Sequence, residues 1–209
     1  MADRLVARLR TPVSRDIIAL YERHAKAFDR DRGRDLQERA WLDRFAALTK
    51  PRGTVLDIGC GMAEPIARHL IERGFHVVGI DASPAMIEMC RARFPDSEWI
   101  VGDMRHLALN RRFDGVIAWD SFFHLTPADQ RAMFPRFAAH ARPGAPLLFT
   151  SGPEAGERVG SYEGEPLYHG SLAPSEYGAL LSSQGFSLRA HALDDVECGN
   201  HTVWLATRD

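Results

Sequence analysis

The segment from Val55 to Leu70, VLDIGCGMAEPIARHL, holds the first residues whose types and spacing could do chemistry. An apolar run ends at Asp57, and Gly59 and Gly61 form a turn before a helical stretch. Glycine has no Cβ, so a ligand can approach the backbone of such a turn closely. In doubly wound α/β folds, ligands bind outside the carboxyl ends of the strands. The segment therefore predicts a ligand site at this strand-to-helix turn.

The charges of this turn narrow the kind of ligand. A dinucleotide-binding turn would carry a third glycine where this chain has Glu64. An anionic pyrophosphate would face the carboxylates of Asp57 and Glu64. The turn thus favours a ligand with a cation or an amine, and the role of Glu64 itself stays open.

Two more carboxylates follow later apolar runs. Asp81 ends VVGID, 20 residues beyond Gly61, where a carboxylate can accept both hydroxyls of a ribose. Asp103, in VGDM, could accept a hydrogen from an adenine amino group, with Met104 against the ring face. Each aspartate alone is also compatible with a turn or cap. Three in register after successive runs form a much more specific pattern.

The elements that must position these residues alternate from Thr54 onward. Short apolar runs at 55–58, 76–80, 98–101, 115–119 and 146–150 are separated by helical stretches near 65–73, 84–94 and 127–142. Ser83 and Thr126 are expected N-caps. Buried strands alternating with helices predict a parallel sheet covered on both faces.

The two ends of the chain differ from this middle. Apolar residues recur at helical spacing in two predicted helices, the first with Ile17, Leu20, Tyr21, His24 and Phe28, the second with Leu36, Ala40, Trp41, Phe45 and Leu48. Residues 151–171 contain five glycines and two prolines and are expected to form a long loop. A helix over 174–183 and strands near 186–193 and 202–207 should close the chain.

Composition sets limits on the class of protein. The 209 residues are 45% hydrophobic and 26% charged, which is ordinary for one soluble domain. No apolar run could span a membrane, and the basic N-terminus has no apolar core of a secretory signal. Three cysteines without metal-type spacing predict no metal site and a reducing, cytoplasmic location.

The formal net charge of −2 hides an asymmetry. Residues 1–50 hold 12 Lys/Arg and 8 Asp/Glu, whereas residues 151–209 hold 3 and 9. Acidic residues are interleaved with the arginines of the first segment, which indicates a solvated helical face or a role in anion or substrate binding. Nothing in this pattern requires a nucleic-acid partner.

Taken together, DIGCG, the Asp of GIDAS, the Asp-Met of VGDM and the strand GVIAWD resemble class I S-adenosylmethionine-dependent methyltransferases. The match covers about residues 54–150, and Ala63 replaces the last glycine of the family's G-C-G-x-G turn. The resemblance implies an α/β, Rossmann-like fold with a seven-stranded, mostly parallel sheet in the order 3-2-1-4-5-7-6. Strand 7 would be antiparallel, with helices on both faces. Residues 1–50 would form an N-terminal helical lid and residues 51–209 the cofactor-binding domain.

The resemblance also implies a cofactor, S-adenosyl-L-methionine, and residues that hold it. Gly59 to Gly61 would line its amino-acid part, Asp81 its ribose and Asp103 its adenine, while Trp119 would lie near the methionine moiety. The cofactor-binding candidates are Tyr21, Asp57, Gly59, Cys60, Gly61, Asp81, Ala82, Met86, Asp103, Met104 and Trp119.

The acceptor side is assigned from position and side-chain type. His124, in WDSFFHL after the fourth strand, is the candidate general base. The substrate-binding candidates lie on the first helix, after the fourth strand and in the C-terminal third: His24, Asp120, Phe123, Tyr168, His169 and His201.

The resulting expectation is methyl transfer to a small-molecule acceptor. The fourth-strand motif lacks the Asn/Asp-Pro-Pro-Tyr/Phe signature of methyltransferases that act on nucleic-acid bases. Two alternatives stay open: an S-adenosylmethionine-binding protein without turnover and, less favoured, a nicotinamide-dependent oxidoreductase. The acceptor, the atom that is methylated and the oligomeric state are not determined by the sequence.

Overall fold

A computed structural model describes residues 16–209. The expected absence of a secretory signal concerns the first residues of the chain, which lie outside the described part. Among the described residues, no helix is both long and apolar enough to cross a bilayer.

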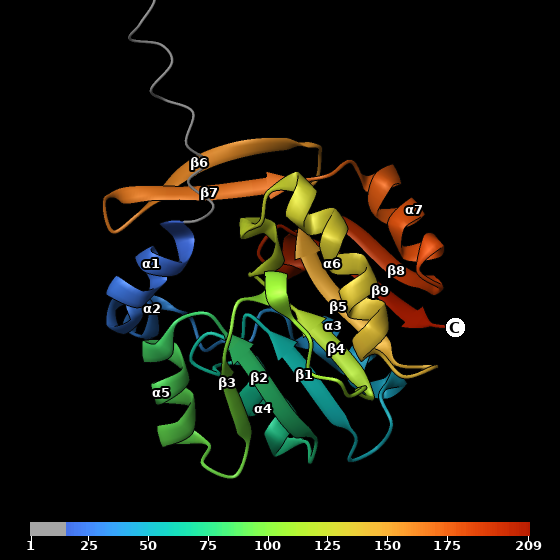
Figure 1. Cartoon of the computed structure of the whole chain (residues 1–209), viewed down its shortest axis with the longest axis horizontal. Helices are drawn as coiled ribbons and strands as arrows, with labels where there is room; N and C mark the ends of the chain where they lie inside the picture. The colour runs from blue at the N-terminus through green and yellow to red at the C-terminus, as the bar shows by residue number, and fades with distance from the viewer. Residues whose placement is uncertain (1–15) are drawn as a thin grey trace, which may run out of the picture.

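The fold is built on one seven-stranded sheet (Figure 1). Its strands are β1 (Thr54–Ile58), β2 (His76–Asp81), β3 (Glu98–Val101), β4 (Gly115–Ala118), β5 (Pro146–Ser151), β8 (Phe186–Asp195) and β9 (His201–Arg208). The order is β3-β2-β1-β4-β5-β9-β8, in which β1 to β5 run parallel and β9 is antiparallel to both neighbours. The predicted fold class and strand order are confirmed.

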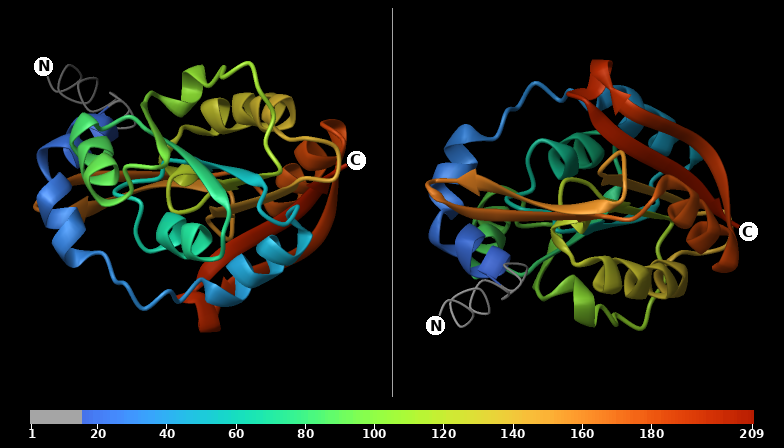
Figure 2. Two further views of the ribbon diagram at one scale, coloured as in Figure 1. Left: turned by 90° about the horizontal axis from the view of Figure 1, so that it is seen from below. Right: turned by 90° about the horizontal axis from the view of Figure 1, so that it is seen from above.

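Helices cover both faces of the sheet (Figure 2). One face packs on α3 (Arg39–Leu48), α4 (Ile66–Glu72) and α5 (Pro84–Arg93), and the other on α6 (Pro127–His140) and α7 (Pro174–Ser183). Successive side chains of a strand point to opposite faces, so Val55 joins the first core while Leu56 and Ile58 join the second. This alternation explains why the central strands read as continuous apolar runs.

The predicted N-terminal helices form, with changed boundaries. The chain turns at His24, which separates α1 (Asp16–Arg23) from α2 (Ala25–Asp31). The predicted stripe of the next helix was wrong at its ends. Leu36 lies before α3 with a positive φ of 49°, and Leu48 is 41% exposed.

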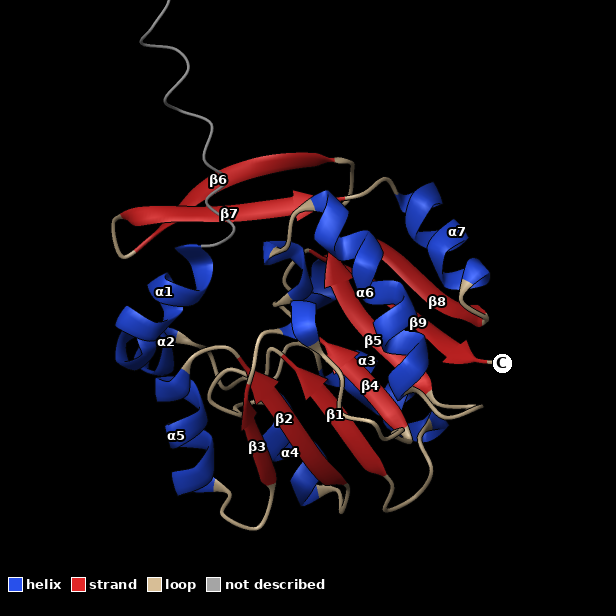
Figure 3. Ribbon diagram, viewed as in Figure 1, coloured by secondary structure: helices blue, strands red, loops and turns tan. Residues whose placement is uncertain are grey.

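The expectation of a long loop over 151–171 was wrong, because this segment forms a two-stranded hairpin (Figure 3). β6 (Gly156–Tyr162) pairs antiparallel with β7 (Glu165–Ser171). Glu163 and Gly164, both with positive φ, make the two-residue turn that suits a hairpin. β6 is largely exposed, so the hairpin needs no apolar alternation that the sequence could have shown.

Three short helical turns complete the described chain: η3 (Met104–His106), η4 (Phe122–His124) and η5 (Val196–Cys198). Both predicted N-caps are present. The Ser83 hydroxyl accepts a hydrogen bond from the backbone N–H of Met86, and that of Thr126 accepts one from Asp129 at 3.2 Å.

Replacing Thr126 by alanine removes the acceptor at the start of α6, and the backbone N–H of Asp129 loses its partner. We expect the free energy of unfolding to fall by about 1 kcal/mol, as for other N-cap losses. Urea denaturation followed by circular dichroism measures this change. The matched variant Thr126→Ser keeps a hydroxyl and should retain most of the stability; an equal loss in both variants would contradict the cap assignment.

Candidate functional site

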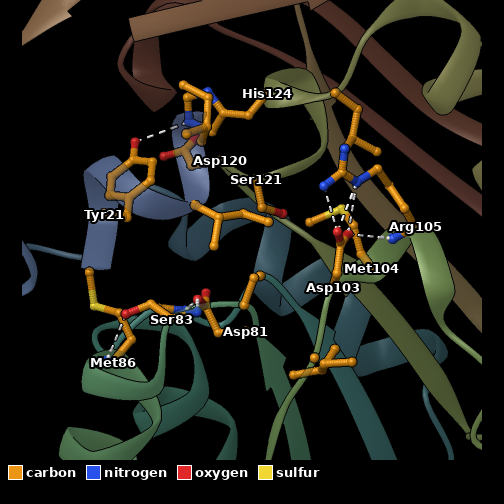
Figure 4. A pocket seen from close by; sticks show the side chains of 18 of the residues that line it. Tyr21, Asp81, Ser83, Met86, Asp103, Met104, Arg105, Asp120, Ser121 and His124 are labelled. Carbon is orange, nitrogen blue, oxygen red and sulfur yellow. Dashed lines mark hydrogen bonds and ion pairs between the residues drawn. The ribbon is translucent and has the colours of Figure 1, made fainter. Parts of the chain in front are cut away.

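The carboxyl ends of β1 to β4 open into one cavity (Figure 4). The empty space, counted out to the open mouth, is about 780 Å³. α1 and α2 supply one wall, and the turns after the four strands supply the rest. The lining residues are Ile17, Ile18, Tyr21, Phe28, Gly59, Gly61, Ile80, Asp81, Ala82, Ser83, Met86, Gly102, Asp103, Met104, Arg105, Asp120, Ser121, His124 and Leu125.

The glycine turn after β1 is wedged between neighbouring segments. The backbone N–H groups of Gly59 and Cys60 both donate to the carbonyl of Ile80, at 2.7 and 3.1 Å. On the other side, a Cβ on Gly59 would lie 2.2 Å from Cβ of Ser121, and Gly59 has a φ of +74°. Ser121 is itself fixed, because its hydroxyl donates to the carbonyl of Ile58 at 2.7 Å. Position 59 therefore requires glycine for both space and backbone conformation.

Asp81 connects this turn to the start of α5. One carboxylate oxygen accepts from the Gly61 N–H at 3.0 Å and the other from the Ser83 N–H at 2.9 Å. A carboxylate has about four acceptor positions, so both oxygens keep capacity for a further donor in the cavity. Burial raises the pKa of Asp81, and the backbone hydrogen bonds partly offset this effect.

Asp57 lies beneath the turn and is not part of the cavity lining. Its side chain is buried, and burial together with the charge of Asp81 raises its pKa to about 7. Two neighbouring carboxyl groups with unequal environments thus share this end of the sheet.

Asp103 lines the cavity after β3, and its carboxylate is held by Arg105. The Arg105 side chain donates to both carboxylate oxygens, with Nη2 2.6 Å from Oδ2, and the Arg105 backbone N–H donates at 2.9 Å. Burial acts to raise the pKa of Asp103, but the bonds from Arg105 outweigh it and the pKa is lowered. The sequence reasoning missed Arg105, although an arginine two residues after the aspartate was a readable signal.

Tyr21 and His124 meet at another side of the cavity (Figure 4). The hydroxyl of Tyr21 lies 3.0 Å from Nε2 of His124, and Nδ1 lies 2.8 Å from the carbonyl of Tyr168. A carbonyl can only accept, so Nδ1 carries the proton and Nε2 accepts from Tyr21. Burial lowers the pKa of His124 to about 4, so its imidazole is neutral at pH 7.

Asp120 lines the same side of the cavity and is paired with His201. The carboxylate lies 2.8 Å from Nε2 of His201, whose Nδ1 faces the Cys198 carbonyl at 2.5 Å. Both ring nitrogens face acceptors, and the pKa of His201 is raised mainly by its bond to Asp120. The Arg32 guanidinium adds a second positive charge 3.8 Å from Asp120.

The other acceptor-side candidates lie outside the main cavity. His24 pairs with Glu165 at 2.7 Å. Phe123 and His169, with ring centroids 5.2 Å apart, line a second cavity at the base of the hairpin. Tyr168 is buried and donates its hydroxyl to Glu157, so it reaches the site only through its backbone carbonyl.

Two predicted cofactor residues also lie away from the lining. The Trp119 ring is buried in the core beneath α3 and α4, 5.5 Å from the ring of His201. Cys60 contributes backbone to the turn, and its side chain belongs to the same core. The remaining cofactor candidates, Tyr21, Gly59, Gly61, Asp81, Ala82, Met86, Asp103 and Met104, all line the cavity.

Sequence reasoning missed residues that the tertiary structure brings to the cavity. Ser121 and Leu125 flank the predicted His124, and Phe28 and Ile17 were on the predicted helical stripe without an assigned role. The stripe was the available signal for the two N-terminal residues.

The hairpin packs against α1 and α2 through contacts that no local sequence motif predicts. Glu165 pairs with both Arg23 and His24. The ring of Tyr162 lies 6.2 Å from that of Tyr21 and 6.3 Å from that of Phe28. The first two helices and the acidic hairpin therefore join beside the cavity.

Glu64, whose role the sequence left open, is the centre of a cluster of arginines. Its carboxylate is nearly buried and lies 2.6 Å from Arg68, 3.3 Å from Arg34 and 3.5 Å from Arg93. A buried carboxylate needs such partners. Glu64 thus ties the segment after α2 to α4 and α5 beside the glycine turn.

Residues 55–144 match a family model described as a methyltransferase domain. A dTDP-3-amino-3,6-dideoxy-alpha-D-glucopyranose N,N-dimethyltransferase of Streptomyces fradiae is 33% identical over 132 residues, which cover 62% of this chain and 51% of that protein. A trans-aconitate 2-methyltransferase of Azoarcus sp. (strain BH72) is 31% identical over 164 residues, 68% of this chain and 61% of its own length. The chain thus spans only about half to three fifths of these curated relatives.

Solved structures share the fold at lower identity. A sugar N-methyltransferase from Streptoalloteichus sp ATCC 53650 superposes with a TM-score of 0.71 at 20% identity, covering 88% of this chain and 92% of that one. The magnesium protoporphyrin IX methyltransferase of Synechocystis PCC 6803, solved with bound SAM, gives 0.70 at 17% identity, with 97% and 100% covered. At these identities the likeness concerns the fold alone.

The close approach at the glycine turn can be tested by Gly59→Ala. The new methyl group would collide with Ser121, and alanine would be strained at this φ, so we expect the free energy of unfolding to fall by roughly 2–4 kcal/mol. Chemical denaturation measures the change.

Two further variants separate space from strain. Gly144→Ala has a similar φ of +80° but no atom within 4 Å of the new Cβ, so it should cost only about 1 kcal/mol of backbone strain. Removing the opposing Cβ in Gly59→Ala/Ser121→Gly should recover part of the loss. Equal costs for the two single variants would argue against the wedge.

Proposed function

We propose that this chain, which carries a class I S-adenosylmethionine-dependent methyltransferase domain, transfers the methyl group of S-adenosylmethionine to a small-molecule acceptor. The product of the cofactor would be S-adenosylhomocysteine. The observation that carries the proposal is one cavity in which the half-buried carboxylate of Asp81 and the Tyr21–His124 pair lie on different sides (Figure 4). Such a cavity can hold a nucleoside at one side and present a proton acceptor at the other.

The cavity residues fit the cofactor. Asp81 keeps free acceptor capacity for the two ribose hydroxyls, and its position is fixed by the N–H groups of Gly61 and Ser83. Gly61 has a φ of +53° and only the Phe28 ring within 4 Å of a Cβ position, which leaves its backbone open to the amino-acid part. Met86 and Met104 line the cavity and offer apolar contact for adenine.

Arg105 changes the proposed role of Asp103. Its guanidinium already donates to both oxygens of Asp103, so an adenine amino group would share an occupied carboxylate. We propose that Asp103 and Arg105 together form the cavity surface on which adenine lies, and that Met104 contacts the adenine ring.

The bound cofactor supplies a sulfonium methyl group that is already activated for transfer. The chain's task is then to hold an acceptor in line, exclude water and remove a proton. Ile17, Ile18 and Leu125 give the cavity apolar wall, and α1 with the hairpin covers its side. These features support a small acceptor enclosed with the cofactor.

The proton route follows from the hydrogen bonds of His124. Tyr21 donates its hydroxyl hydrogen to Nε2 of His124. A methyl acceptor that is hydrogen-bonded to the Tyr21 oxygen can therefore transfer its proton to this oxygen as Tyr21 passes its own proton to Nε2. The imidazolium that forms keeps the hydrogen bond from its Nδ1–H to the Tyr168 carbonyl. The nearby negative charge of Asp120 stabilises it. The acceptor atom would therefore be an oxygen or nitrogen that loses a proton on methylation.

The comparisons support small acceptors without choosing among them. One relative is named as acting on an amino sugar nucleotide and another on trans-aconitate. A panel of amino, hydroxyl and carboxylate compounds, assayed by S-adenosylhomocysteine release, tests the proposal. Cofactor binding with no release across the panel would favour the binding protein without turnover, and binding of NADH in its place would favour the oxidoreductase.

Asp81→Ala should weaken binding of S-adenosylhomocysteine, because the ribose hydroxyls lose a charged acceptor worth about 1.5–3 kcal/mol. This corresponds to roughly a 10- to 150-fold higher dissociation constant by calorimetry. Asp43→Ala, which removes an exposed carboxylate of α3 outside the cavity, is the control. An unchanged affinity in Asp81→Ala would rule out the ribose assignment.

His124→Asn should lower kcat by roughly 10²–10⁴-fold, the usual contribution of a general base, while cofactor affinity changes little. Tyr21→Phe breaks the same proton route and should also lower kcat. Since the pKa of His124 is about 4, its own titration should leave wild-type kcat flat between pH 6 and 8.

The control for this pair is His76→Asn, an exposed histidine at the opposite end of β2. It should retain wild-type kcat. Full activity in His124→Asn with any acceptor that the wild type methylates would remove the histidine from the mechanism.

A further inference from the structure

A second charged site lies on the outer face of α6, away from the cofactor cavity. A groove runs between α6 and the segment 107–112, with about 880 Å³ of empty space counted out to its open mouth. Leu107 and the small residues Ala132, Pro135 and Ala139 line it, together with three arginines, Arg111, Arg112 and Arg136. No carboxylate is among its lining residues.

The three arginines differ in how many of their N–H donors have a partner. Arg111 lies over the ring of Phe113 and pairs with Glu98 at 2.6 Å. Arg136 donates one N–H to the carbonyl of Leu107 at 3.2 Å, but its Nε is buried with no partner among the described residues. Arg112 makes no hydrogen bond or ion pair within the part of the chain that the structure describes.

The neighbouring histidine fixes the geometry of this site without adding charge. Nδ1 of His140 donates to the carbonyl of Arg136 at 2.7 Å, and Nε2 accepts from the N–H of Leu109 at 3.0 Å. A ring nitrogen that accepts carries no proton, so the imidazole is neutral. His140 thereby connects the segment 107–112 to α6 and fixes the two sides of the groove relative to each other.

We propose that this groove binds the phosphate group of a small phosphate monoester. Glu98 neutralises one of the three guanidinium charges, which leaves about two, and a phosphate monoester carries nearly two negative charges at pH 7. The planar donors of arginine suit phosphate geometry, and the exposed guanidinium of Arg112 has no partner in the described part of the chain. The groove is larger than a phosphate group, and its apolar floor offers room for the organic part.

The site has a direct structural link to the cofactor cavity. The segment 107–112 follows η3, whose Met104 and Arg105 line that cavity. A ligand between Arg112 and Arg136 would join this segment to α6. Binding at the groove can nevertheless be measured alone, so it does not depend on the proposed methyl transfer.

The test is a titration of the full chain, labelled with ¹⁵N, with inorganic phosphate at constant ionic strength. We expect saturable shifts confined to the segment 107–112 and the facing residues of α6. Arg112→Gln and Arg136→Gln should each raise the dissociation constant at least about tenfold, the value of one lost charged hydrogen bond. Arg158→Gln, an exposed arginine of β6 outside the groove, should leave it unchanged.

Several results would overturn the proposal. Shifts that do not saturate, that sodium chloride reproduces, or that survive in both groove variants would show that phosphate has no specific site here. Equal affinity for succinate would refute the assignment to phosphate. Arg112 is exposed, so Arg112→Gln keeps the test valid if Arg136→Gln fails to fold, and S-adenosylhomocysteine binding measured in parallel reports the cofactor site separately.

Discussion

The arrangement of the site depends on the close contact between Gly59, just after β1, and Ser121, which follows β4. Gly59 fits between the Ile80 carbonyl and the Cβ of Ser121 only because it has no side chain. This wedge brings three strand ends to one place. Gly61 is then within hydrogen-bond distance of Asp81, and Ser121 is held against Ile58. These contacts fix the positions of the strand ends that surround the cavity.

Burial around this wedge gives neighbouring ionisable groups different properties. Asp57 and Asp81 lie at the same sheet edge, and their desolvation raises both pKa values. His124 is kept neutral by burial, whereas His201, bonded to Asp120, has a raised pKa. Two histidines that look equivalent in the sequence therefore lie in opposite electrostatic environments, one that lowers the pKa and one that raises it.

Contacts join the N-terminal and C-terminal parts of the described chain. The N-terminal helices carry Arg23, which pairs with Glu165 of the hairpin, and α3 carries Trp41, whose indole N–H donates to Asp195 at 2.8 Å. The linker residue Arg32 lies near Asp120. Segments more than a hundred residues apart thus cover the cavity together, which is consistent with a site that encloses a small acceptor. The arginines around the groove on α6 take no part in these contacts, which sets that surface apart from the charge pairs of the N-terminal helices.

The sequence by itself determined the alternating strands and helices and the aspartates at the strand ends, because these depend on local periodicity and on a turn that tolerates only certain residues. Asp81, Asp103 and His124 could be found this way, and all three line the cavity. The order of the strands came from the resemblance to a known family. Only the tertiary structure decided the roles of Arg105, Ser121 and Glu64, and it moved Trp119 and Tyr168 out of the lining. It also replaced an expected loop with a hairpin whose first strand, β6, is largely exposed and lacks an apolar pattern. The physical reason is the same in each case: partners distant in the chain and burial by later elements set a side chain's direction, its hydrogen bonds and its charge.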